Sequence, residues 1–464
     1  MTLSFLLVLF LALPIYSVLF YYIVILWLAA KFPGHTKRLG LGVKGLQSLD
    51  VLIPIREEPV EIVKETLKRN REGFETVECV KKVTLLSDDN QEYFQRLVKD
   101  IEPFSKVQII RRQEPRGGRT GALDDYFTST DADYILIQDV DGFIDKRSLT
   151  SLCESLEGSA AYVIPWKGYS LETTRVAKAL IFFTDFGSQL LYKLRFKAGF
   201  FVFPLGSGTA YHRETIVGLG GWGDGIIQDD IYMGVKLASK GYIPALLEDG
   251  EIYVLVPSRM YSLRKQQSRW AYGTSEVLSR NLKKILGAPI PLHMKLEMII
   301  YMLQPVETLP PFLALTLSPL VAFMDQVSTP LTLQILQVFG VFAPLVALGI
   351  LYGLLLYKVQ PGALSGKFKE YVVNAGRFSA ILAVLSPHLS IAALRGLLRL
   401  GLKWEVTPKG EKEKKSPKDN TPFWIVLWST LGIIFSVIYA NMYSLTVPLL
   451  YLIASLYSLF RLEL

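Results

Sequence analysis

Asp139 and Asp141 stand one residue apart directly after the apolar run Tyr134–Ile137, and Gly142 follows them. Consecutive bulky apolar residues predict a short buried strand, and the glycine predicts a turn at its end. Ligands of open α/β sheets bind at the carboxyl ends of strands, so both carboxylates would face a ligand crevice. Such a pair can hold Mg²⁺ or Mn²⁺ together with substrate phosphates. The alternative is a strand that simply ends in a polar turn, which is common for an isolated Asp-x-Asp.

Asp230 is a candidate general base. It follows Gln228 and Asp229 and opens the helical pattern Ile231–Ser239. A base that takes a proton from an attacking hydroxyl must lie within hydrogen-bond reach of it and stay ionised near neutral pH. Aspartate meets this requirement unless it is buried without partners. The alternative is a carboxylate that caps the amino end of the helix.

Acidic and basic groups also follow other predicted strands. Glu58 ends the stretch Ile53–Glu58, and Asp88 and Asp89 follow the next strand; these carboxylates could accept hydrogen bonds from a nucleobase N–H and from ribose hydroxyls. Arg119 lies in the glycine-rich stretch 116–123, where glycines permit close approach of the backbone and guanidinium groups suit phosphate oxygens. The alternatives are solvated turns and a flexible basic loop.

Gln266, Arg269 and Trp270 fall on one face of a predicted helix, because they are spaced by three and four residues. Arg269 could stabilise a departing diphosphate, and Trp270 could stack on a sugar ring. An arginine and a tryptophan at a membrane interface also occur without any catalytic role.

Short apolar runs alternate with helical patterns between residues 45 and 257. Such alternation predicts one α/β domain with a doubly wound, mostly parallel sheet. The predicted helix Val60–Arg71 lies between the first two strands, and the predicted strands are Leu49–Ile55, Val83–Leu86, Val107–Ile110, Tyr134–Ile137 and Ala161–Pro165.

The rest of the chain predicts membrane helices. Of the 464 residues, 50% are hydrophobic, and residues 3–30 are apolar enough to cross a bilayer. Basic residues follow this first span, so the α/β domain is expected in the cytoplasm and the amino terminus outside. Further spans are predicted at 309–325, 331–357, 423–441 and 444–460. These five spans would make a multi-pass protein of the cell membrane.

Two segments have the composition of helices that lie on the membrane surface. Arg259–Lys284 carries basic residues between aromatic and aliphatic ones, within a predicted interfacial region 258–305. Residues 378–403 are apolar but are interrupted by Pro387, His388 and basic residues, so they are also interpreted as interfacial. If 378–403 crossed instead, the loop after it would face away from the catalytic domain.

The net charge of +8 comes largely from basic residues beside the apolar segments, so we expect a membrane surface, and no nucleic acid, as the partner. Cys79 and Cys153 are far apart in sequence and have no metal-ligand spacing. They are expected to be separate buried thiols in a reducing compartment.

Together these motifs resemble the membrane-bound family 2 glycosyltransferases, the processive synthases of cellulose and hyaluronan and their relatives. Asp139 and Asp141 match the family's Asp-x-Asp, and Gln266, Arg269 and Trp270 match its Gln-x-x-Arg-Trp. The other segments that match are Gln228–Asp230 for Thr-Glu-Asp, Arg119–Asp124 for Lys-x-Gly-Ala-Leu-Asn, Phe203–Gly208 for the acceptor segment, and Trp404–Gly410, in the stretch 404–418, for a gating loop. The departures are Glu57 for Asn, Arg119 for Lys, Asp124 for Asn and Gln228-Asp229 for Thr-Glu.

The resemblance implies a GT-A-like α/β fold inserted among transmembrane and interfacial helices. It also implies an inverting hexosyltransferase that uses a nucleotide-diphosphate sugar, such as a UDP-sugar, and Mg²⁺ or Mn²⁺ at Asp139 and Asp141. Asp230 would be the base, Arg269 would steady the diphosphate, and Trp270 with Gln266 would position the acceptor. Asp88 and Asp89 would contact the nucleoside, and Glu58, Arg119 and Asp139 would complete the donor site.

Two alternatives stay open. The acceptor is either a growing polysaccharide, which the gating-type loop favours, or a lipid such as a polyprenyl phosphate or glycolipid. A different class, a transporter or scaffold without catalysis, would be expected to place charges within its spans. Few are present there, Glu307 and Asp325 lying near the ends of one segment.

Overall fold

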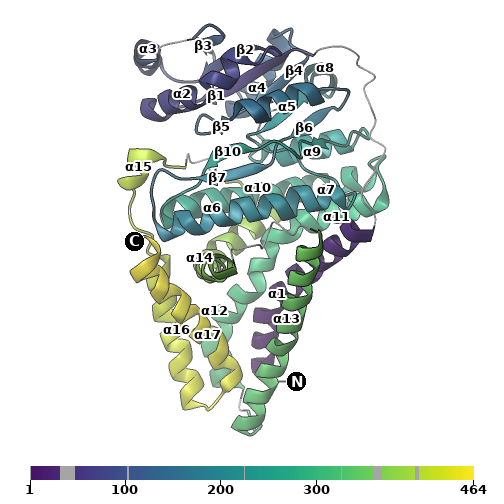
Figure 1. Cartoon of the computed structure of the whole chain (residues 1–464). Coiled ribbons are helices and arrows are strands. Elements are labelled where there is room, and N and C mark those ends of the chain that lie inside the picture. The colour runs from purple at the N-terminus through teal and green to yellow at the C-terminus, as the bar shows by residue number, and fades with distance from the viewer. Residues whose placement is uncertain are drawn as a thin grey trace.

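A computed structural model describes residues 2–31, 47–101, 104–223, 225–325, 327–359, 368–402 and 407–464. An α/β domain forms the upper part of the molecule, and a group of long apolar helices forms the lower part (Figure 1). Amphipathic helices lie between the two parts. The predicted division into a sheet domain and apolar helices is therefore observed.

Within the described residues, the central sheet has seven strands in the order β3-β2-β1-β4-β8-β6-β9. β1, β2, β3 and β4 pair in parallel, whereas β8 is antiparallel to both β4 and β6, and β6 and β9 are parallel. The bounds are Leu49–Ile55 for β1, Val80–Ser87 for β2, Val107–Arg111 for β3, Tyr134–Ile137 for β4, Ala161–Val163 for β6, Thr209–His212 for β8 and Ala245–Leu246 for β9. The prediction of a mostly parallel sheet is confirmed. Because β1, β2 and β4 are parallel, the acidic residues that follow them gather at one edge.

Helices cover both faces of this sheet. One buried core packs α2 (Val60–Thr76) and α5 (Lys146–Ser155) against β1, β2 and β4. The other packs α4 (Gly118–Ser129) and α9 (Asp229–Ala238) on the opposite face, around Phe127 and Trp222. Shorter helices α3 (Gln91–Asp100) and α8 (Arg213–Gly218) complete the domain. A small second sheet, β5-β10-β7, joins Phe143–Ile144, Ile252–Leu255 and Trp166–Tyr169 below the central one.

Cys79 and Cys153 form a disulfide, with Cα atoms 6.1 Å apart. The expectation of two separate thiols is therefore wrong. The residues lie 74 positions apart in the chain, but the start of β2 and the end of α5 meet in the same core. Sequence spacing cannot reveal such a contact, because packing of the helix layer on the sheet creates it.

Helices α6 (Arg175–Gly187) and α10 (Met260–Leu286) run beneath the small sheet, and α11 (Leu292–Leu303) continues from α10. The π-helical segment Ser188–Leu194 and α7 (Arg195–Lys197) extend α6. Below them lie α1 (Leu3–Lys31), α12 (Leu309–Met324), α13 (Leu331–Val359), α16 (Thr421–Ile438) and α17 (Met442–Tyr457) (Figure 1). These last helices coincide closely with the predicted spans.

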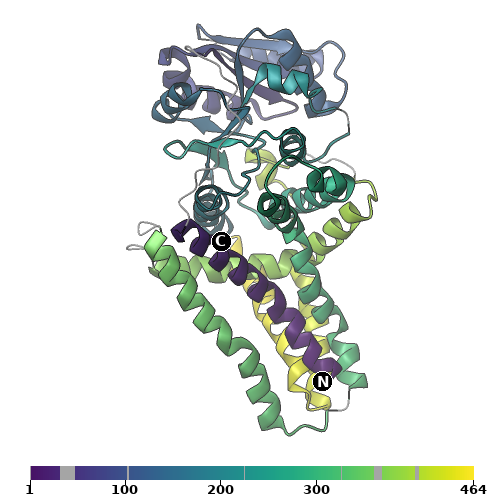
Figure 2. The same ribbon diagram turned by 90° about the vertical axis from the view of Figure 1, so that its right-hand side faces the viewer.

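By length and composition, six helical segments of the described chain could cross a membrane, which indicates a membrane protein. The one candidate that is not among the five predicted spans is α14 (Phe368–Leu397). α14 is seen end-on in Figure 1 and runs crosswise at the top of the apolar helices in Figure 2. Its buried face packs against α6 and α10 through Ile381, Val384 and Leu385. The interfacial placement of α14 stays a prediction, which this orientation favours.

Candidate active site

Asp139 and Asp141 lie at the carboxyl end of β4, as predicted. The backbone N–H of Asp139 donates to Ser207 Oγ at 3.0 Å, and the turn continues to Gly142. Each carboxylate has a cationic partner. Arg119 Nη1 lies 3.0 Å from Asp139 Oδ1, and Lys409 Nζ lies 3.0 Å from Asp141 Oδ2. The two acidic groups therefore share one strongly charged edge of the sheet with two side chains from distant segments.

Asp230 is the second residue of α9 and is buried. Its Oδ2 accepts from the backbone N–H of Gly206 at 2.9 Å, and its Oδ1 accepts from Gln228 Nε2 and the backbone N–H of Ile231, both at 2.8 Å. Burial, together with the neighbouring charge of Asp229, raises the pKa of Asp230 to about 6. Asp230 is therefore ionised at neutral pH and binds a proton more readily than an exposed aspartate.

Arg119 joins the two acidic groups. Besides Asp139 it pairs with Asp229 Oδ2 at 3.3 Å, and its Nη2 donates to the carbonyl of Gly206. Burial alone would lower the pKa of Arg119, but the carboxylates of Asp139, Asp229 and Asp230 raise it, so the guanidinium stays charged. The structure thus brings Asp139 and Asp230, 91 positions apart by residue number, around one arginine.

Gln266, Arg269 and Trp270 lie on α10, half-buried beneath the domain. Burial lowers the pKa of Arg269, while the charges of Asp139, Asp229 and Asp230 act to raise it. Arg269 is therefore close enough to sense the same carboxylates that surround Arg119. The Trp270 ring lies 5.9 Å from the ring of Trp166 in β7. The α10 motif and the strand-end carboxylates thus converge.

Asp88 and Asp89, expected to contact a nucleoside, are both engaged within the protein. Asp88 accepts from Arg112 through both oxygens, at 2.5 and 2.6 Å. Asp89 accepts from the backbone N–H of Glu57 at 2.5 Å and from Ser87 Oγ at 2.7 Å. Glu57 has a positive φ of 55°, which is uncommon for a residue with a side chain and marks a constrained turn. The roles of Asp88 and Asp89 in donor binding stay predictions.

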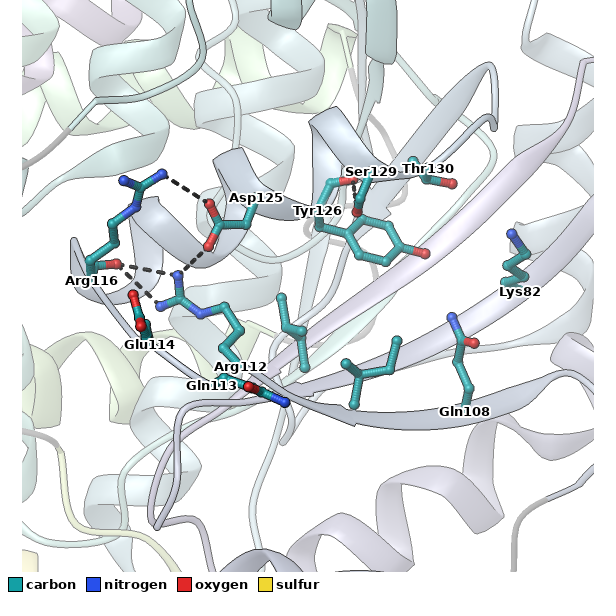
Figure 3. A pocket seen from close by; sticks show the side chains of 12 residues that line it. Lys82, Gln108, Arg112, Gln113, Glu114, Arg116, Asp125, Tyr126, Ser129 and Thr130 are labelled. Carbon is teal, nitrogen blue, oxygen red and sulfur yellow. Dashed lines mark hydrogen bonds and ion pairs between the residues drawn. The ribbon is translucent and has the colours of Figure 1, made fainter. Parts of the chain in front are cut away.

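Arg112 also binds Asp125 at 2.8 Å and the carbonyl of Arg116 (Figure 3). It donates to the carbonyl of Gly118 as well. It thereby holds the start of α4, the helix that carries Arg119, and the turn that leads into it. A groove of about 710 Å³ beside it runs between β2, β3 and α4 and does not include Asp139, Asp141 or Asp230. Arg112 is thus a buried support for the loop.

A segment from the carboxyl-terminal part completes the site. Trp404, Glu405 and Val406 of the predicted gating loop lie outside the described residues, but Thr407–Gly410 and α15 (Gly410–Lys414) are described. Lys409 Nζ bonds Glu58 Oε1 at 2.9 Å as well as Asp141, and the nearby carboxylates keep the pKa of Lys409 raised despite its burial. Lys412 Nζ donates to the carbonyl of Glu57 at 2.6 Å.

Glu413 anchors this segment. Its buried carboxylate accepts from Ser258 N and Oγ, both at 2.9 Å, and from Arg259 N at 3.1 Å, just before α10 begins. Sequence reasoning named the loop but missed Lys409, Arg112 and Ser207 as individual site residues. Lys409 lies inside the loop motif and Ser207 lies inside the predicted acceptor segment Phe203–Gly208, so those motifs were the available signals; nothing local marks Arg112.

The donor atoms fit a divalent ion held jointly with a substrate. No group of three or more His, Cys, Asp or Glu side chains suited to a metal occurs within the described ranges. Asp139 and Asp141 offer two carboxylates, and Mg²⁺ is usually bound by one or two carboxylates plus substrate phosphates rather than by an all-protein cage. The residues present therefore match an ion that binds with a diphosphate.

Two family models match the chain. "Glycosyl transferase family 2" covers residues 50–215, and "Glycosyl transferase family group 2" covers residues 134–359. A probable glycosyltransferase of Sulfolobus acidocaldarius is 29% identical over 410 residues, which cover 86% of this chain and 85% of that protein. The poly-beta-1,6-N-acetyl-D-glucosamine synthase of Staphylococcus aureus is 23% identical over 203 residues, covering 43% of this chain and 49% of the synthase.

Among solved structures, the mannosyltransferase PcManGT from Pyrobaculum calidifontis, in complex with GDP-Man and Mn²⁺, superposes with a TM-score of 0.51 at 15% identity. The match covers 86% of this chain and 99% of that one. At this level of identity the likeness concerns the fold alone. It shows that the predicted GT-A-like fold is correct.

Proposed function

We propose that this chain, which carries a family 2 glycosyltransferase domain in a GT-A-like fold, moves a hexose from a nucleotide-diphosphate sugar to an acceptor hydroxyl, with inversion at the transferred carbon. The observation that carries the proposal is the position of Arg119 between Asp139 and Asp229, with Asp230 joined to the same turn. A candidate base and a candidate donor-binding group therefore lie around one cation.

Asp230 is the proposed base. The acceptor oxygen forms the new bond to the sugar carbon, the bond from that carbon to the diphosphate breaks, and the hydroxyl proton passes to Asp230. Its raised pKa, about 6, suits this task, because a base with a pKa near the working pH is ionised and still accepts protons well. The hydrogen bonds from Gly206 and Gln228 hold the Asp230 carboxylate in one orientation.

The departing diphosphate needs positive charge. Arg119, Arg269 and Lys409 supply three cationic side chains near the strand-end carboxylates. Mg²⁺ or Mn²⁺, held by Asp139 and Asp141, would neutralise charge on the leaving group when bound. Cations fixed in a partly buried site stabilise such charge more strongly than cations in water. Gln266 and Trp270 are proposed to position the acceptor sugar.

The proposed donor is a UDP-sugar, with Glu58 and the Asp88–Asp89 pair at the nucleoside side. PcManGT was solved with GDP-Man, so guanosine donors belong in the same screen. Because Asp88 already accepts two hydrogen bonds from Arg112, the nucleobase of the donor would contact this ion pair rather than a free carboxylate. Competition between UDP- and GDP-sugars therefore tests directly which nucleobase the enzyme recognises.

The proposed acceptor is a growing polysaccharide. Asp230 favours a hydroxyl over a polyprenyl phosphate, because a phosphate is already ionised at neutral pH, needs no base and would be repelled by the buried carboxylate. A glycolipid hydroxyl remains compatible with the same chemistry. The apolar helices are proposed to embed the enzyme in the cell membrane with its catalytic domain in the cytoplasm.

The test uses the full chain purified in detergent, incubated with labelled UDP- and GDP-sugars and Mg²⁺ or Mn²⁺. Product sizing separates a ladder or polymer from a single increment on a lipid. Asp230→Asn should bind donor as the wild type does, yet transfer at least about a thousandfold more slowly. A non-catalytic transporter or scaffold would show neither transfer nor metal-dependent donor hydrolysis with any of these sugars, and that result would remove the proposal.

A further inference from the structure

The turn at Gly206 and Ser207 contacts both the proposed base and the proposed metal motif. The N–H of Gly206 donates to Asp230 at 2.9 Å, and its carbonyl accepts from Arg119. Ser207 Oγ accepts from the backbone N–H of Asp139 at 3.0 Å. Ser207 is only 1% exposed, so its side chain lies inside the protein. The proposed base and the metal motif are thus tied to the same two residues.

Trp166 connects this turn to α10. Its indole Nε1–H donates to the carbonyl of Ser207 at 2.7 Å, and its ring packs against Trp270 with centroids 5.9 Å apart and planes at 40°. Trp166 is itself fixed, because it pairs with Ile252 in the small sheet and its carbonyl accepts from Ser188 Oγ at 2.6 Å. One side chain therefore touches the turn through its N–H and the Gln-x-x-Arg-Trp helix through its ring.

We propose that Trp166 is a positioning residue for transfer, which holds the acceptor platform Trp270 at a fixed distance from Asp139 and Asp230. This inference rests on the proposed function. Transfer requires the acceptor hydroxyl, the sugar carbon and the base to meet, and small displacements of such groups cost large factors in rate. The α/β domain carries the carboxylates and α10 carries Trp270, so a contact between the two parts must set their separation.

Water needs no aromatic platform to reach the donor carbon, whereas a sugar acceptor does. Loss of the Trp166 contacts should therefore impair transfer to the acceptor much more than hydrolysis of the donor. A residue that only stabilised the fold would lower both rates together. The ratio of transfer to hydrolysis thus separates positioning from stability.

The test compares wild-type protein with Trp166→Phe, which retains a ring but loses the N–H donor. We expect the transfer-to-hydrolysis ratio to fall about tenfold, with the KM for donor unchanged. Trp222→Phe is the matched control. Trp222 is buried in the same domain and packs against Phe127 and Tyr211. That variant should lower the melting temperature and leave the ratio unchanged.

A double-mutant cycle provides the second measurement. If Trp166 acts through Trp270, Trp166→Phe should change the ratio little in a Trp270→Ala background. An unchanged ratio in Trp166→Phe, or full additivity with Trp270→Ala, overturns the inference while wild-type transfer still supports the proposed function. If Trp166→Phe does not fold, Trp166→Tyr in the same cycle decides the question. Absence of transfer by the wild type instead counts against the proposed function itself.

Discussion

Lys409 lies 3.0 Å from Asp141 through its ammonium nitrogen, although 268 positions separate the two residues. The same nitrogen bonds Glu58 at 2.9 Å. A side chain from the carboxyl-terminal segment therefore compensates acidic groups at the ends of β1 and β4. Because a divalent ion held at Asp141 would experience this positive charge, the lysine and the ion oppose one another electrostatically.

Replacing Lys409 by Met should strengthen Mn²⁺ binding in the absence of donor by about tenfold, because an opposing charge is removed from a partly buried site. Titration of the full chain with Mn²⁺, followed by electron paramagnetic resonance of the free ion, measures this directly. Lys414→Met is the control, since Lys414 is half-exposed and pairs with Glu172 and Glu411 outside the site. Equal Mn²⁺ affinity in Lys409→Met and wild type would contradict the prediction.

The rate of transfer should rise with pH through about 6, because Asp230 acts when ionised and its raised pKa sets the midpoint. Below that pH the protonated carboxyl cannot accept the acceptor's proton, so activity declines. Asp229→Asn should move the midpoint to lower pH, since the charge of Asp229 helps to raise the pKa of Asp230. Rates at saturating donor between pH 4.5 and 8 test both statements; a midpoint that moves upward in Asp229→Asn argues against them.

Loss of the disulfide should destabilise the domain without abolishing the chemistry. Closing a loop of 74 residues in the unfolded chain corresponds to about 4 kcal/mol in the chain-entropy estimate, and measured effects are often smaller. Cys79→Ser together with Cys153→Ser should therefore unfold at a lower temperature and retain the wild-type transfer rate at low temperature. Thiol labelling of the denatured wild type comes first: labelling of both cysteines before reduction would show that the bond is absent.

The stability of the protein should fall when one member of a buried ion pair beneath the site is replaced, and much less when both members are replaced. Arg195 is fully buried and bonds Glu297 at 2.7 and 2.8 Å, while Tyr21 of α1 donates to Glu297 at 2.5 Å. Glu297→Leu should lower the free energy of unfolding by about 3–5 kcal/mol, because it leaves the buried charge of Arg195 without its partner. Arg195→Met combined with Glu297→Leu should recover most of that loss. Thermal unfolding in detergent compares them, and additive losses would contradict this account.

Much of this protein could be predicted from local sequence. Tyr134–Ile137 and Leu49–Ile55 match β4 and β1 residue for residue, because uninterrupted apolar runs bounded by turn residues leave few alternatives to a buried strand. The segments predicted as spans are long apolar helices in the structure, because a long apolar run is visible in the sequence; that each of them crosses a bilayer stays a prediction. Asp139, Asp141 and Asp230 were candidates because each stands where an element begins or ends.

Only the tertiary structure decided which distant segments contact each other, because such contacts have no local signature in the sequence. The bond between Cys79 and Cys153, the place of Lys409 against Asp141 and the link from Trp166 to Ser207 all arise when separate layers pack together. Periodicity and spacing describe neighbours within about one helical turn or strand, so they carry no information about which distant side chains meet. The identity of the candidate chemical groups was therefore visible in the sequence. Their arrangement around Arg119 was set by the sheet order, and the contacts of Lys409 with Glu58 and Asp141 were set by the docking of the carboxyl-terminal segment.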